Sequence, residues 1–275
     1  MSAYTCAIMD EYPNFNIVGE EWSLNPIIVS KWQQGNEQTK NLNSCLPSLM
    51  DFPLQGTLIE SLKQEETWNT GLNDLYELIA CDYVYPDANN LVIFPDNHDM
   101  DRYYTQLNED FELYKMGLTY LATTRGIPQI YYGTEILMSN PLSHDHGEIR
   151  TDFPGGWKSD EVNGFTGKNL SPKAKEAQDF MKTLLNFRKN CPTIHKGKMM
   201  HYAPDNGLYV FFRYDENQKI IVLINKSDKS RKLKSTSFPE MEIGSNEGVD
   251  IFSNESIIID KFEIPAKSAT IIRFK

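Results

Sequence analysis

The stretch Leu91-Val92-Ile93-Phe94-Pro95-Asp96-Asn97-His98-Asp99 joins a short apolar run directly to a cluster of polar side chains. Four apolar residues in a row, with no polar alternation, are typical of a strand that is buried on both faces, as in parallel sheets. A second stretch, Phe15-Asn16-Ile17-Val18-Gly19-Glu20-Glu21-Trp22, also ends in carboxylates. Each stretch therefore predicts a short buried strand that ends at an acidic side chain.

Two further apolar runs share this character, over residues 45–52 and 126–133. The spacing of apolar residues between and around the runs predicts helices over residues 1–11, 56–66, 70–81, 108–125 and 172–190. Residues 23–45 and 134–170 lack such periodicity, so we expect long loops there. A helix followed by four strand–helix units is the order of parallel α/β folds. Because four strands cannot close an eight-stranded barrel, a doubly wound sheet is an alternative on this pattern alone.

The character of the chain changes after about residue 195. Helical spacing disappears, and short β runs alternate with polar turns, over residues Leu208–Tyr214, Lys219–Asn225, Val249–Phe252, Ser256–Ile259 and Ala269–Phe274. Such a pattern is typical of a small antiparallel domain. We therefore expect an α/β domain over residues 1–195 and a β-sandwich domain over residues 196–275.

Composition and charge narrow the class of partner. The net charge of −11 repels nucleic acid and anionic membrane surfaces, and is compatible with a neutral ligand such as a sugar. No apolar stretch is long enough for a transmembrane helix, and the first residues lack the basic start of a signal peptide. Cysteines 6, 45, 81 and 191 show no zinc or redox spacing, so we interpret them as buried thiols, with one disulfide left open.

The two strand-end acids, Glu20 and Asp99, are candidate catalytic residues. Catalytic side chains of barrel enzymes lie at strand ends, and glycoside hydrolysis needs two carboxyl groups on either side of one bond. Strand-end acids can also cap a following helix or meet solvent, and for Glu20 alone this interpretation is the stronger one. Asp99 belongs to the dense polar cluster that starts at Asp96, and such a cluster is costly to hold together unless it serves a site.

These motifs carry a resemblance to the α-amylase family of glycoside hydrolases. Val18-Gly19-Glu20-Glu21-Trp22 resembles the acid/base segment of that family, and Phe94-Pro95-Asp96-Asn97-His98-Asp99 resembles its final conserved segment. Residues 126–135 are similar to its eighth strand. Ile149-Arg150-Thr151-Asp152-Phe153-Pro154-Gly155-Gly156-Trp157 is similar to a loop of the neopullulanase and cyclomaltodextrinase branch. Residues 248–252 and 264–268 are similar to the C-terminal β-domain of the same enzymes.

The resemblance implies a fold and a set of roles. The fold would be the second half, strands 5 to 8, of a TIM (β/α)8 barrel, followed by the β-sandwich domain. The activity would be retaining hydrolysis of an α-glucan such as starch, maltooligosaccharide, cyclodextrin or pullulan. The resemblance leaves open whether the enzyme prefers α-1,4 or α-1,6 linkages, and whether it hydrolyses the substrate or transfers the sugar to another sugar. The roles would be acid/base for Glu20, transition-state stabiliser for Asp99, sugar contact for His98, aromatic face on the leaving-group side for Trp22, and donor-side hydrogen bonds for Arg150 and Asp152.

One element of the family pattern is absent from these 275 residues. The family's nucleophile follows the fourth strand in a Gly-Phe-Arg-x-Asp pattern, which does not occur here, and residues 1–11 resemble the helix after that strand. We therefore expect the chain to be the C-terminal portion of such an enzyme, with little or no activity of its own. The alternative is a non-catalytic carbohydrate-binding or inactive truncated remnant.

The missing half has consequences for cofactors, partners and location. An open half-barrel exposes strand edges, so we expect self-association. No cofactor or metal site is evident in the chain; the resemblance implies a structural calcium in the full-length enzyme, with ligands largely in the missing half. The compartment stays open, because a signal peptide of a periplasmic or secreted parent enzyme would lie outside these residues.

Overall fold

The computed structural model describes residues 2–39, 43–243 and 247–274, so Met1 of the first expected helix and residues 40–42 of the first expected loop lie outside the described residues. The amino-terminal part holds four short strands, β1 (Val18–Gly19), β2 (Ser48–Leu49), β3 (Val92–Ile93) and β4 (Ile127–Pro128). The pairs β1–β2 and β3–β4 are parallel, and a parallel bridge from Met50 to Val92 joins them. The four strands thus form one parallel row in chain order.

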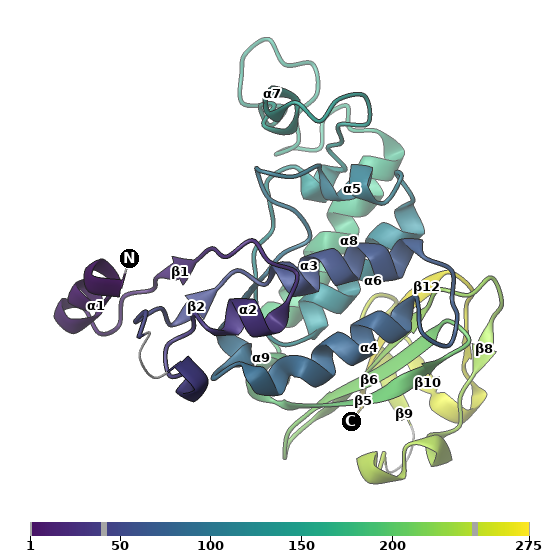
Figure 1. Cartoon of the computed structure of the whole chain (residues 1–275). Helices are drawn as coiled ribbons and strands as arrows, with labels where there is room; N and C mark the ends of the chain where they lie inside the picture. Colours follow the sequence, from purple (N-terminus) through teal and green to yellow (C-terminus); the bar gives the residue numbers. More distant parts are fainter. Residues whose placement is uncertain (1, 40–42, 244–246, 275) are drawn as a thin grey trace.

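Helices follow the strands, as the periodicity predicts (Figure 1). Their bounds are α1 (Ser2–Glu11), α2 (Pro26–Ser30), α3 (Phe52–Lys63), α4 (Leu72–Ala80), α5 (Tyr103–Gln106), α6 (Phe111–Thr123), α7 (His146–Ile149), α8 (Pro172–Lys189) and α9 (Pro192–Lys196). Short 3-10 turns are η1 (Glu37–Thr39), η2 (Cys81–Val84), η3 (Ala88–Asn90) and η4 (Thr134–Ile136). The parallel α/β order expected from the sequence is confirmed.

Two expected boundaries are wrong because local capping decides them. The segment 23–45 is not a continuous loop: the Asn25 side chain accepts the Ile27 N–H, and Pro26 occupies the first turn, so α2 begins there. Helix α3 begins at Phe52 rather than at residue 56, because Asp51 accepts the Leu54 N–H at 3.0 Å. Helices α2 and α7 lie in segments that the sequence predicts as loops, because helices this short show no periodic apolar face.

The carboxy-terminal part is a six-stranded antiparallel sheet in the order β10-β9-β12-β7-β6-β5, beside a two-stranded ladder of β11 and β8. Its strands are β5 (Lys198–Asp205), β6 (Leu208–Tyr214), β7 (Lys219–Asn225), β8 (Arg231–Lys232), β9 (Glu247–Asp250), β10 (Ser256–Ile258), β11 (Glu263–Ile264) and β12 (Ser268–Phe274). The antiparallel pairing expected for this part of the chain is confirmed. The layer opposite the sheet includes β11 and the 3-10 turns η6 (Pro239–Met241) and η7 (Ile259–Lys261). The 3-10 turn η5 (Ser235–Ser237) has no buried residue.

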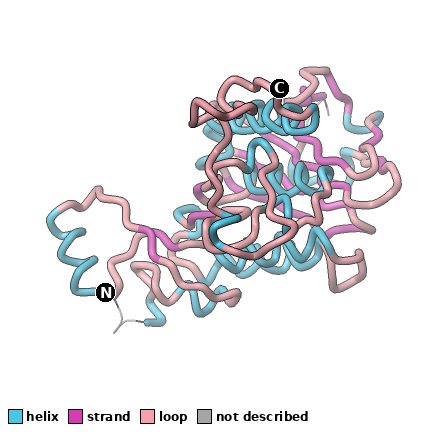
Figure 2. Tube along the Cα trace, turned by 90° about the horizontal axis from the view of Figure 1, so that it is seen from above, coloured by secondary structure: helices cyan, strands magenta, loops and turns pink. Residues whose placement is uncertain are grey.

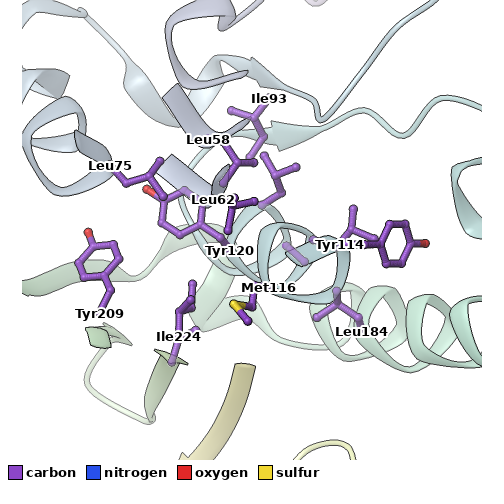
Figure 3. Packing of buried hydrophobic residues seen from close by; sticks show 14 of the residues in the cluster. Leu58, Leu62, Leu75, Ile93, Tyr114, Met116, Tyr120, Leu184, Tyr209 and Ile224 are labelled. Carbon is purple, nitrogen blue, oxygen red and sulfur yellow. The ribbon is translucent and has the colours of Figure 1, made fainter. Parts of the chain in front are cut away.

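A single hydrophobic core joins the two parts (Figure 3). It extends from Ile93 of β3 through Leu58 of α3 and Tyr120 of α6 to Tyr209 and Ile224 of the sheet. The other face of the sheet packs on a second cluster that includes Phe238 and Met241. Strands β6 and β7 are therefore covered on both faces, which explains their continuous apolar character.

The interpretation of the cysteines as buried thiols holds only for Cys191, since Cys81 is half-buried and the one disulfide that the sequence left open is present. Cys6 of α1 and Cys45, 39 residues apart, form a disulfide, whereas Cys81 and Cys191 are free. Helix α1 lies at the end of an arm that projects from the body of the molecule (Figures 1 and 2). The disulfide, together with the hydrogen bond from the Thr5 hydroxyl to the Ser44 carbonyl, ties this helix to the segment before β2.

A buried charge cluster lies between the strands and the helices. The Arg125 guanidinium, before β4, pairs with Asp51 after β2 and donates to both carboxylate oxygens of Asp82, at 2.9 and 2.6 Å. Asp51 and Arg125 are 1% and 5% exposed. Burial alone would lower the pKa of Arg125, but the two carboxylates raise it above its usual range. Asp51, a third strand-end acid, is thus fully engaged in the structure.

Candidate active site

Close packing at the end of β1 explains why glycine precedes Glu20. A Cβ atom on Gly19 would lie 2.6 Å from Leu46 and 2.9 Å from Leu49, so a side chain there would clash. The Gly19 carbonyl accepts the Met50 N–H at 2.9 Å, which fixes the strand end against β2. The next residue, Glu20, is exposed, and its side chain makes no hydrogen bond or ion pair with the residues that the structure describes. Its carboxylate is therefore accessible to a ligand.

Stacked aromatic rings connect the ends of three strands. Trp22 stacks on Phe52 with ring centroids 4.6 Å apart, and Phe52 meets Phe94 edge-on at 5.1 Å. Phe52 and Phe94 are buried, whereas Trp22 is 53% exposed. One side of the Trp22 indole thus rests on the core and fixes the segment that carries Glu20.

Asp96 anchors the loop that follows β3. Its carboxylate is 1% exposed and accepts the Tyr103 N–H at 2.7 Å and the Thr134 hydroxyl at 3.3 Å. Burial raises the pKa of Asp96 to about 7, although the hydrogen bond from Tyr103 and the charge of Arg102 oppose the rise. The side-chain oxygen of Asn97 accepts the Asp99 N–H at 2.8 Å. These contacts fix the backbone from which His98 and Asp99 project.

Asp99 is the centre of an ion-pair network. Arg150 Nη2 lies 2.6 Å from Asp99 Oδ1, and Arg150 Nε donates to the His98 carbonyl at 2.9 Å. His98 Nε2 lies 3.3 Å from Asp99 Oδ2. The carboxylate of Asp99 is 32% exposed, so it contacts cations on one side and solvent on the other. The structure therefore brings together three residues that the sequence places in two separate motifs.

His146 is a member of this network that the sequence analysis missed. Its Nδ1 lies 2.7 Å from Arg150 Nη2 and 3.8 Å from the Asp99 carboxylate. Helix α7 spans a single turn and places His146 and Arg150 four residues apart, on one face. The sequence pattern that could have predicted this contact is the i, i+4 spacing of the two residues. That pattern is weak evidence for a helix in a segment without apolar periodicity.

Asp152 is separated from this network and engaged elsewhere. Its Oδ2 accepts the indole N–H of Trp157 at 2.8 Å. The intervening Thr151 carbonyl accepts the Tyr132 hydroxyl at 3.0 Å, which ties the loop to the segment after β4. Of the six candidate residues, Asp99, His98 and Arg150 are in mutual contact, and Glu20, Trp22 and Asp152 are not part of that contact set.

The described ranges 2–39, 43–243 and 247–274 contain no group of three or more His, Cys, Asp or Glu side chains that could hold a metal ion. Within the same ranges, no helix has the length and apolar character needed to cross a bilayer.

The buried Asp96 carboxyl gives a pH-dependent stability. In the unfolded chain its pKa is near 4, so its contribution to stability is complete below that pH and is lost as pH rises toward 7. Replacing Asp96 by asparagine keeps the acceptor for Tyr103 and removes the charge. We expect the difference in the free energy of unfolding between Asp96→Asn and the wild type to grow in favour of the variant by roughly 2–3 kcal/mol as the pH rises from 5 to 8. Urea denaturation at both pH values measures this, and a difference that does not change with pH would contradict it.

Comparison with known families identifies the class of protein. The family model described as the α-amylase catalytic domain matches residues 1–197, and the model of the cyclo-malto-dextrinase C-terminal domain matches residues 199–273. The chain belongs to the α-amylase family. The resemblance that the sequence motifs indicated is thereby confirmed. The fold is that of the family, a TIM-barrel catalytic region followed by a C-terminal β-domain.

Individual relatives give the same family and differ in length from this chain. This chain is 26% identical over 263 residues to a cyclomaltodextrin glucanotransferase of Klebsiella oxytoca and 24% identical over 265 residues to an α-amylase of Niallia circulans. These matches cover 83% and 91% of this chain. The chain spans only 38% and 46% of the length of those two relatives.

Solved structures share the fold at low sequence identity. The α-amylase from Geobacillus thermoleovorans complexed with acarbose has a TM-score of 0.75 and 20% identity, and the match covers 100% of this chain and 56% of that one. AmyP in complex with maltose has a TM-score of 0.77 and 17% identity, with 100% and 61% covered. The family to which the chain belongs is thus one of glycosidases and transglycosylases that act on α-glucans.

Proposed function

We propose that this chain supplies the acid/base and the stabilising carboxylate of an α-glucan-cleaving site. The observation that carries the proposal is the Asp99, Arg150 and His98 network at the end of β3, in the same parallel row whose first strand ends at the exposed Glu20. The relatives named above are a cyclomaltodextrin glucanotransferase and an α-amylase, and one structural neighbour was solved with maltose bound. Both facts support an oligosaccharide of α-linked glucose as the ligand.

Each residue has a role in a retaining mechanism. Glu20 protonates the glycosidic oxygen as the bond breaks, and returns as base to activate water. Asp99 binds sugar hydroxyls beside the reacting carbon, where a carboxylate stabilises the positive charge that develops. His98 donates to the same sugar, and Trp22 stacks on the sugar on the leaving-group side. Arg150 hydrogen-bonds sugars on the donor side, and Asp152, on the same loop, serves that side through the Trp157 indole that it holds.

The nucleophile of that mechanism has no candidate among the described strand ends. Asp51 caps α3 and pairs with Arg125, and it is 1% exposed, so it cannot attack a sugar. We propose that residues 1–195 form strands 5 to 8 of the barrel, residues 196–275 form the C-terminal domain, and the nucleophile comes from strands outside these residues. The 275-residue polypeptide by itself then has little or no hydrolase activity.

Two measurements test this function. Incubation of the polypeptide with maltoheptaose, cyclodextrin and pullulan should give no product above the buffer rate, while calorimetric titration should show binding of maltoheptaose and none of cellohexaose. Steady turnover of any α-glucan would contradict the missing nucleophile. Equal binding of the α- and β-linked oligosaccharides would contradict the α-glucan site.

An in-frame Gly-Phe-Arg-x-Asp strand in the coding sequence upstream of Met1 would favour a piece of an active enzyme over a non-catalytic carbohydrate-binding remnant.

We also propose that the polypeptide self-associates through the open ends of the strand row. Strands β1 and β4 are the first and last of the row, and Val18 and Ile127 on them are 45% and 48% exposed. Unpaired strand edges with apolar side chains recruit other strands. Light scattering should give the mass of at least two chains, and a monodisperse monomer would contradict this proposal.

A further inference from the structure

An exposed tryptophan lies on the loop that carries Arg150. Trp157 is 65% exposed, so its aromatic ring is accessible from solvent. It comes five residues after Asp152, in the segment between α7 and α8. None of the roles described above uses this residue.

The loop holds the indole in one orientation. The indole N–H donates to Asp152 Oδ2 at 2.8 Å, and the backbone N–H groups of Trp157 and Gly155 donate to Asp160 Oδ2 at 3.0 and 2.7 Å. Gly155 has a φ of 104°, and a Cβ there would lie 2.6 Å from the Asn163 side chain, so this turn requires glycine. The ring is therefore fixed before any ligand arrives, which lowers the entropy cost of binding.

A second exposed tryptophan lacks such support. Trp68 is 89% exposed, and its indole N–H has no hydrogen-bond partner among the residues that the structure describes. It lies in the turn between α3 and α4, close in the chain to Glu66, which pairs with Lys226 of the C-terminal part. Exposure alone thus does not explain the arrangement around Trp157.

Trp157 is connected to Asp99 by a short path. Arg150 pairs with Asp99 at 2.6 Å, and Asp152, the partner of the indole, follows two residues later. Two residues span at most about 7 Å of backbone. Arg150, which contacts Asp99, and Asp152, which contacts the indole, thus lie close together on one loop, and this closeness supports a single glucan that contacts both Asp99 and Trp157.

We propose that Trp157 is an outer stacking platform for the α-glucan bound at Asp99, and that Asp152 is the positioning residue that holds the ring. This inference rests on the proposed function. The flat apolar face of an indole matches the C–H face of a glucose ring, and the polar edge of the indole is already satisfied by a carboxylate. The predicted ligand is a neutral α-linked chain longer than the sugars that contact Asp99 directly.

The test compares a long and a short ligand by calorimetric titration of the whole polypeptide. Trp157→Ala should bind maltoheptaose roughly tenfold more weakly, a difference of about 1.4 kcal/mol, and bind maltotriose with less than about a twofold change. Trp157→Phe should recover most of the affinity for maltoheptaose. Trp68→Ala, the matched control, should bind both ligands as the wild type does.

A double-mutant cycle tests the positioning role of Asp152. Asp152→Ala should weaken maltoheptaose binding, and adding Trp157→Ala should weaken it no further, because the carboxylate acts through the ring. Additive losses would overturn the positioning role in favour of direct sugar contact. Unchanged maltoheptaose affinity in Trp157→Ala would overturn the platform while leaving the proposed function intact. Failure of the wild type to bind maltoheptaose would overturn both.

Discussion

Replacement of Arg125 by methionine is expected to lower the free energy of unfolding by about 3–5 kcal/mol. The guanidinium is 5% exposed and is shared between Asp51 and Asp82. Without it, Asp51, 1% exposed, is a buried charge whose cation is gone, and its remaining hydrogen bond to the Leu54 N–H cannot compensate. A loss of this size exceeds that of most single substitutions.

The control for Arg125→Met removes an ion pair of the same kind from the surface. Lys175 pairs with Asp179 one helical turn away, and the two side chains are 50% and 61% exposed. Lys175→Met should change stability by less than about 1 kcal/mol. Guanidinium denaturation of both variants measures the difference. A loss below about 1 kcal/mol for Arg125→Met would show that the cluster contributes little to the fold.

The parts of the site that could be predicted from the sequence are those that depend on local pattern. Short apolar runs end at Glu20 and at Asp96 through Asp99, so the pattern of residues alone places both motifs at strand ends. The prediction that the first of these runs is buried is wrong, because Phe15 and Val18 are 54% and 45% exposed. Gly19 has a local reason as well, since Leu46 and Leu49 leave no room for a side chain. The order of strands and helices follows from the same runs.

The contacts that the sequence could not provide are long-range. The disulfide of Cys6 and Cys45 has no spacing signal, because it depends on where the fold places α1. Asp51 looks like another strand-end acid in the sequence, and only the approach of Arg125, 74 residues later, shows that it is engaged. His146 lies in a segment without apolar periodicity, so its contact with Arg150 emerges only when that segment folds over Asp99.

Loss of the Asp99 carboxylate is expected to have the largest effect on ligand binding. Asp99→Asn removes the charge that accepts sugar hydroxyls and the partner of Arg150, while it keeps the size of the side chain. A hydrogen bond to a charged group contributes roughly 1.5–3 kcal/mol, so the affinity for maltoheptaose should fall roughly 10–100-fold. The carboxylate is partly exposed and does not support the core, so the variant should keep its unfolding midpoint.

The control for this variant is Asp228→Asn. Asp228 lies in the C-terminal domain, 88% exposed, and pairs there with Lys267. The substitution removes the same charge from the chain, so any non-specific effect of net charge on the titration appears in both variants. A specific role of Asp99 is the difference between them.

Titration of maltoheptaose into the wild type, Asp99→Asn and Asp228→Asn therefore tests most directly whether Asp99 marks an α-glucan site. We predict that the wild type and Asp228→Asn bind with the same affinity, and that Asp99→Asn binds at least roughly tenfold more weakly. Equal affinities in all three proteins would contradict the assignment of this network to sugar binding.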